Sequence, residues 1–128
     1  MRRFGWLVSV PLLCACDRRA PFDIPTMTHQ LTTAGYMVTP APIPSNLAPL
    51  TKRPTVINVS CIDAKKGATT DTFCVIRCTS NAACGAVLGS TGETYGDWQR
   101  GPSVIVHQQC AQTSASFDCT AARKAIGE

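Results

Sequence analysis

The sequence predicts a small disulfide-rich domain, α+β or mainly β, with short antiparallel strands and a C-terminal helix after a proline-rich extended tether. The chain has 128 residues and eight cysteines, and seven of its nine prolines fall within residues 21–54. Short runs of β-branched residues separated by turn residues follow residue 55. A domain of about 70 residues buries a thin core, and disulfides often supply the missing stability.

The first fifteen residues have the layout of a secretory signal peptide. Met1-Arg2-Arg3 is basic, and the apolar run that follows spans ten residues, 4–13. A membrane-spanning helix needs roughly 20 apolar residues, and this run is half as long and interrupted by Pro11. The sequence therefore predicts an exported protein, in which cysteines commonly form disulfides.

Leu13-Cys14-Ala15-Cys16 resembles the lipobox of bacterial lipoproteins. The resemblance implies cleavage before Cys16 and attachment of acyl chains to its thiol and its new amino group. Two or three acyl chains anchor a protein firmly, because each buried methylene contributes about 0.8 kcal/mol. The chain would then face the periplasm from a membrane of the bacterial cell envelope. The residue after the anchor, Asp17, does not decide whether this is the inner or the outer membrane. The alternative is ordinary cleavage after Cys16, which would release a free chain beginning at Asp17.

Residues 16–54 are expected to form the lipid anchor and an extended tether. Thr39-Pro40-Ala41-Pro42-Ile43-Pro44 favours polyproline II, because proline fixes φ and removes amide donors. Stretched out, the tether would reach on the order of 100 Å. The proline-free residues 27–38 are either a short docking segment or a coil packed against the domain.

The stapled domain is expected over residues 55–128. We predict strands over residues 55–62, 72–78 and 103–107, with turns at Lys65-Lys66-Gly67 and in the glycine-rich residues 89–101. A short helix is predicted near the C-terminus, with Asp118 as its N-cap and Gly127 as its stop signal.

Six cysteines fall in this domain, and an even set in an exported chain predicts three disulfides. The set is Cys61, Cys74, Cys78, Cys84, Cys110 and Cys119. Six cysteines allow fifteen pairings, which the sequence leaves open. Cys74 and Cys78 are poor partners if they share a strand, because four strand residues span roughly 13 Å and a bridge needs Cα atoms within about 7 Å.

The sequence does not predict an enzyme, a cofactor or a metal site. His107 is interpreted as a buried or rim histidine, and Ser103 lies too far along the same strand to bond to it. A zinc site built from Cys74, Cys78, Cys84 and His107 would lack the usual closely spaced cysteine pair.

Charge argues against nucleic acid as a partner. Removing Arg2 and Arg3 with the signal peptide leaves ten basic and eight acidic residues, a net charge of +2. These basic residues are scattered and lack the interleaved aromatics that bind single strands.

Thr91-Gly92-Glu93-Thr94-Tyr95 and Trp98-Gln99-Arg100-Gly101 resemble the two short motifs of membrane-bound C-type lysozyme inhibitors, which are periplasmic lipoproteins. The resemblance implies that Thr91 and Arg100 would enter the lysozyme cleft from a loop that also carries Tyr95 and Trp98. The alternative is that Tyr95 and Trp98 only cap a glycine-rich loop.

These observations favour a membrane-anchored, non-enzymatic protein-binding or structural module of the cell envelope. Its partner would be an envelope or secreted protein, as in a secretion or conjugation complex. A periplasmic lysozyme inhibitor and a phage or plasmid exclusion lipoprotein are the alternatives.

Overall fold

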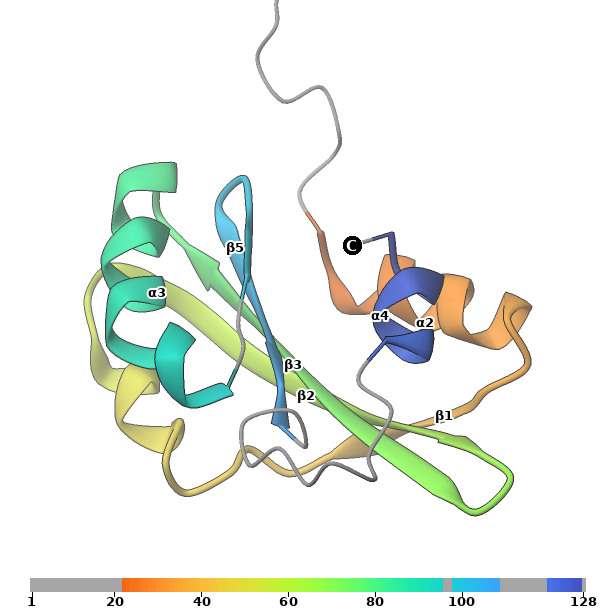
Figure 1. The fold of residues 1–128 in the computed structure, drawn as a ribbon. Helices are drawn as coiled ribbons and strands as arrows, with labels where there is room; N and C mark the ends of the chain where they lie inside the picture. Colours follow the sequence, from red (N-terminus) through yellow and green to blue (C-terminus); the bar gives the residue numbers. More distant parts are fainter. Residues whose placement is uncertain (1–21, 96–97, 109–119, 128) are drawn as a thin grey trace, which may run out of the picture.

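The computed structural model describes residues 22–95, 98–108 and 120–127. These residues form an antiparallel sheet of five strands in the order β1-β2-β3-β5-β4. The strands are β1 (Met37–Ala41), β2 (Val56–Lys66), β3 (Thr69–Cys78), β4 (Trp98–Arg100) and β5 (Ser103–His107). The helices are α2 (Ile24–Thr33), the 3-10 helix η2 (Ala48–Lys52), α3 (Asn81–Tyr95) and α4 (Ala121–Ala125). The α2 and α4 helices lie side by side, away from α3 (Figure 1).

The long β2–β3 hairpin forms the centre of the sheet. It turns at Gly67, whose φ of +63° suits a residue without a side chain. Strand residues alternate between the two faces, so one face packs on α3 and η2 and the other on α2 and α4. The three predicted strands are confirmed, and β2 and β3 extend further toward the turn than expected.

Each face of the sheet has its own core, because helices cover both faces. On the α3 face, Leu47 and Leu50 from the η2 region and Val87 from α3 pack over the strands. On the α2 face, the core is built from residues of the N-terminal segment, the strands and α4. Its buried members are Phe22, Met27, Leu31, Tyr36, Ile62, Ala64, Phe73, Val75, Ile105, Ala122 and Ile126.

The predicted tether is wrong for its described part, because residues 22–54 are folded into the domain. Asp23 caps α2 by accepting a hydrogen bond from the Thr26 amide at 2.9 Å. Phe22 precedes this cap and Met27 lies four residues after it, the two positions of a hydrophobic staple. The domain therefore begins at or before residue 22, and not at residue 55.

Proline is tolerated in this segment because of where each ring lies. Pro25 is in the first turn of α2, where amide groups have no helical partner. Pro40 is in the edge strand β1, which needs ladder hydrogen bonds on one side only. Proline content therefore does not exclude regular structure in this segment, because these positions permit the ring.

The turn predicted over residues 89–101 is also wrong in most of its length. Helix α3 continues to Tyr95, and β4 begins at Trp98. Within the described part of this range, a tight turn is present at Gly101, with a φ of +61°. Packing of Cys84 and Val87 against the sheet offsets the low helix propensity of the glycines. The C-terminal helix is confirmed as α4, which Gly127 terminates with a φ of +84°. Asp118, its expected N-cap, lies outside the described residues.

Candidate functional site

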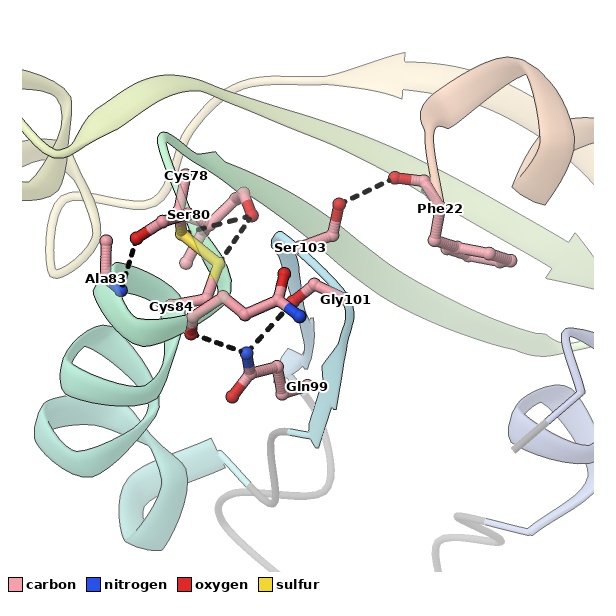
Figure 2. Close-up of a disulfide and its surroundings, with 10 residues drawn as sticks. Phe22, Cys78, Ser80, Ala83, Cys84, Gln99, Gly101 and Ser103 are labelled. Atoms are coloured by element: carbon pink, nitrogen blue, oxygen red, sulfur yellow. Dashed lines mark hydrogen bonds between the residues drawn. A yellow bond between two sulfur atoms is a disulfide. The ribbon is translucent and has the colours of Figure 1, made fainter. Parts of the chain in front are cut away.

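Two of the predicted disulfides are present among the described residues. Cys61–Cys74 joins paired positions of β2 and β3, and Cys78–Cys84 joins the end of β3 to α3. Figure 2 shows the second bridge beside Ser80, whose hydroxyl accepts a hydrogen bond from the Ala83 amide at the start of α3. Cys110 and Cys119 lie outside the described residues and are the remaining pair of the predicted six.

These pairings also bear on the zinc alternative. Cys78 and Cys84 are bonded to each other, and Cys74 is bonded to Cys61. Cys74 belongs to the core under α3, whereas His107 stacks on Phe73, which belongs to the opposite core. The four residues therefore do not converge on one point.

The four residues assigned to partner binding come from two elements. Thr91 and Tyr95 lie in α3, and Trp98 and Arg100 lie in β4. Trp98 is half-buried, and the Arg123 guanidinium lies 4.4 Å from the centre of its ring. Arg100 is also half-buried, and its Nη1 donates a hydrogen bond to the Ile126 carbonyl at 3.3 Å. Trp98 and Arg100 thus make contacts that hold α4 to the sheet.

Arg100 also belongs to a cluster that fixes the start of the described chain. Its guanidinium carbon lies 4.6 Å from the centre of the Phe22 ring. The Ser103 hydroxyl donates a hydrogen bond to the Phe22 carbonyl at 2.9 Å, as Figure 2 shows. Phe22 is only 1% exposed. We call Phe22, Arg100 and Ser103 the anchor joint, because Arg100 and Ser103 hold Phe22 against the sheet.

A small pocket adjoins the anchor joint, between the start of α2 and the sheet. Its volume is about 170 Å³, and it is lined by Asp23, Ile24, Pro25, Asn58, Ser60, Val75 and Arg77. Arg77 pairs across strands with Asn58 on β2 and with Ser103 on β5, which places the pocket next to the joint. We call it the entry pocket.

The entry pocket carries both signs of charge. Hydrogen bonds from the side chain and the amide of Thr26 lower the pKa of Asp23, and the positive charge of Arg77 lowers this pKa further. Asp23 is therefore ionised at neutral pH. The Arg77 Nε is buried and has no hydrogen-bond partner among the described residues.

A second polar feature is the buried pair Asp71–His107. The Asp71 Oδ1 and His107 Nε2 atoms are hydrogen-bonded at 2.7 Å, and the two residues are 2% and 0% exposed. The His107 ring stacks on Phe73 with 4.2 Å between ring centres. His107, which was expected to be either buried or at a rim, is buried. The Ser103 hydroxyl donates its hydrogen bond to the Phe22 carbonyl. Because the imidazole is fully covered, the pair fastens β3 to the end of β5.

Asp71 also borders a pocket of about 110 Å³ that is lined by Tyr36, Lys66, Thr69, Asp71 and Ala121. Lys66 is one of these lining residues. Its ammonium donates a hydrogen bond to the Ala34 carbonyl at 2.9 Å and lies 5.1 Å from the centre of the Tyr36 ring. These contacts hold the tip of the hairpin against the end of α2.

Among the described residues, no three histidine, cysteine or acidic side chains gather as they would around a metal ion. Within the same ranges, no helix has the length and apolar character to cross a membrane. Comparison of the chain with protein-family models, with curated proteins and with solved structures gives no match.

Proposed function

We propose that this protein is a lipid-anchored, non-enzymatic protein-binding or structural module of the bacterial cell envelope, of the kind that serves secretion or conjugation complexes. The observation that carries the proposal is the lipobox-like Leu13-Cys14-Ala15-Cys16, which ends six positions before the buried Phe22. A lipidated Cys16 would lead almost directly into the folded domain.

The short connection sets where the domain would sit. Only residues 17–21 separate Cys16 from Phe22. Six Cα–Cα steps of at most about 3.5 Å give a reach of roughly 20 Å. This is one fifth of the reach of the extended tether expected from the prolines. The domain would therefore stay at the membrane surface, and a partner would have to meet it there.

The edge strand β1 is the surface best suited to an extended protein partner. In the described part of the chain no strand pairs with its outer side. Met37 in β1 is 69% exposed. An extended segment of an envelope protein can add to such an edge through main-chain hydrogen bonds, with apolar side chains supplying specificity.

The contacts of Arg100 lead us to favour this module over a lysozyme inhibitor. An inhibitor of the resembled kind would present Arg100 to an enzyme cleft. Here the guanidinium contacts Phe22 and Ile126 within the domain. Releasing it would loosen the anchor joint.

Site-specific photo-cross-linking in the native host tests the proposal. A photoreactive residue at Met37 is expected to give a discrete adduct with an envelope protein. The same residue at Lys52, which is exposed on η2, serves as the matched control and should give none. The adduct should also disappear when Cys16→Ala removes the anchor. Equal adducts from both positions, no adduct, or an adduct that is independent of Cys16 would contradict the proposal.

A further inference from the structure

We propose that Met37 is a reversible oxidation site, and that a sulfoxide at this position weakens the docking of an extended partner on β1. The oxidant is hydrogen peroxide. The effect on docking rests on the proposed function, because it needs a partner at the β1 edge. The oxidation itself depends only on the folded chain, so the two steps can be tested separately.

Met37 carries the accessible reduced sulfur of the described residues. It is 69% exposed, whereas Met27 is 0% exposed in the core on the α2 face. The cysteines in the described ranges are all bonded in disulfides. Met1 belongs to the predicted signal peptide. A peroxide must reach a sulfur atom to oxidise it, so Met37 should react before Met27.

The oxidation transfers one oxygen atom to the Met37 sulfur. A sulfur lone pair attacks hydrogen peroxide, an S–O bond forms, the O–O bond breaks, and the second oxygen leaves as water. The sulfur loses two electrons and the peroxide gains them. A methionine sulfoxide reductase reverses the change with a dithiol, which becomes a disulfide while the oxygen leaves as water. The site can therefore return to its starting state.

The fold should tolerate this change, because Met37 lies outside both cores. Its neighbour Val38 packs against the core on the α2 face, and Ala41 packs against the core on the α3 face. Met37 is in neither group of described side chains, although it is the first residue of β1. Making its side chain polar removes no core contact, so the effect should fall on the edge strand and not on folding.

The cross-strand neighbour of Met37 suits the oxidised form. Met37 pairs with Lys65 on β2, and both residues are exposed. Directly opposite residues in an antiparallel pair have Cβ atoms about 4.5–5.5 Å apart, so the Lys65 ammonium can donate a hydrogen bond to a sulfoxide oxygen. An apolar partner side chain that packs on the thioether would then have to desolvate a polar group. Oxidation therefore opposes docking at this end of β1.

The oxidation is tested on the mature chain as isolated, treated with hydrogen peroxide and analysed by tandem mass spectrometry. In the folded chain, Met37 should be oxidised on the order of tenfold faster than Met27, because only Met37 is exposed. In urea the two rates should converge, since unfolding exposes both thioethers. Equal rates in the folded chain would overturn the proposed oxidation site.

The effect on docking is tested by photo-cross-linking in the native host, with the photoreactive residue at Thr39. Thr39 is exposed on the same strand, so Met37 keeps its thioether. Peroxide should lower the adduct yield by roughly threefold or more, and methionine sulfoxide reductase should restore it. The matched control Met37→Leu keeps an apolar side chain that peroxide does not oxidise, so its adduct yield should stay constant.

Two results would overturn the effect on docking. One is an unchanged yield from the wild type after Met37 is shown to be oxidised. The other is an equal loss from Met37→Leu, which would place the oxidation on the partner. If Thr39 gives no adduct even before peroxide, the proposed function fails and the docking step fails with it. The mass measurement needs no partner, so it still decides whether Met37 is the oxidation site.

Discussion

The guanidinium carbon of Arg100 lies 4.6 Å from the centre of the Phe22 ring. The same side chain donates a hydrogen bond to the Ile126 carbonyl, so it ties the start of the described chain to the end of α4. Neither contact joins neighbours in the sequence. The anchor joint therefore forms only when the whole domain folds.

Replacing Arg100 should destabilise the domain. Arg100→Ala removes the cation–π contact with Phe22 and the hydrogen bond to Ile126. We expect the free energy of unfolding to fall by about 1–2 kcal/mol, measured by urea denaturation with the disulfides intact. Arg53→Ala, at an exposed position, should change it by less than about 0.5 kcal/mol. An Arg100→Ala variant of unchanged stability that lost inhibition of lysozyme would favour the inhibitor alternative.

The two disulfides should differ in their contribution to stability. Cys61–Cys74 closes a loop with a sequence separation of 13, and Cys78–Cys84 closes one of 6. From the chain-entropy model we expect losses of about 3 kcal/mol for the double Cys61→Ala/Cys74→Ala variant and about 2.4 kcal/mol for Cys78→Ala/Cys84→Ala. Urea denaturation of the two variants measures both. A larger loss from the shorter loop would show that burial or strain outweighs loop entropy.

The contribution of Asp23 should depend on pH. Because the pKa of Asp23 is lowered in the folded state, its stabilisation is complete above the usual aspartate pKa near 3.9 and is lost as pH falls through the lowered value. At pH 7, Asp23→Ala should cost about 1 kcal/mol through loss of the α2 cap. The difference between wild type and variant should shrink in acid, as followed by thermal melts from pH 7 to pH 2. A constant difference would contradict this role.

The Asp71–His107 pair should be more sensitive to single than to double replacement. His107→Phe leaves Asp71 buried without this partner, and we expect a loss of about 3 kcal/mol. The double variant Asp71→Leu/His107→Phe removes both polar groups and should recover part of that loss. A double-mutant cycle of unfolding free energies measures the coupling. Additive losses would mean that the two residues act independently.

The sequence predicted the elements whose signals are local. Residues 103–107 form a strand as expected, because the three consecutive β-branched residues at its centre, Val104, Ile105 and Val106, are buried on the two faces of the sheet. The α2 helix has a local signal too, in the Asp23 cap and in Met27 and Leu31 spaced by four, but the surrounding prolines favour an extended segment. Helix α3 carries glycines that disfavour a helix locally, and packing against the sheet stabilises it.

The anchor joint and the entry pocket could not be predicted in the same way. The Ser103 hydroxyl and the Phe22 carbonyl are 81 positions apart, and only the strand order brings them together. Asn58, Arg77 and Ser103 become neighbours through two strand registers that no single stretch of sequence specifies.

The intact mass of the protein from the membrane fraction is the decisive test of whether Cys16 anchors this domain close to a membrane. We expect a mature chain that begins at Cys16, is heavier by its acyl groups, and is recovered with the membranes. An unmodified chain that begins at Asp17, recovered in the soluble fraction, would contradict it.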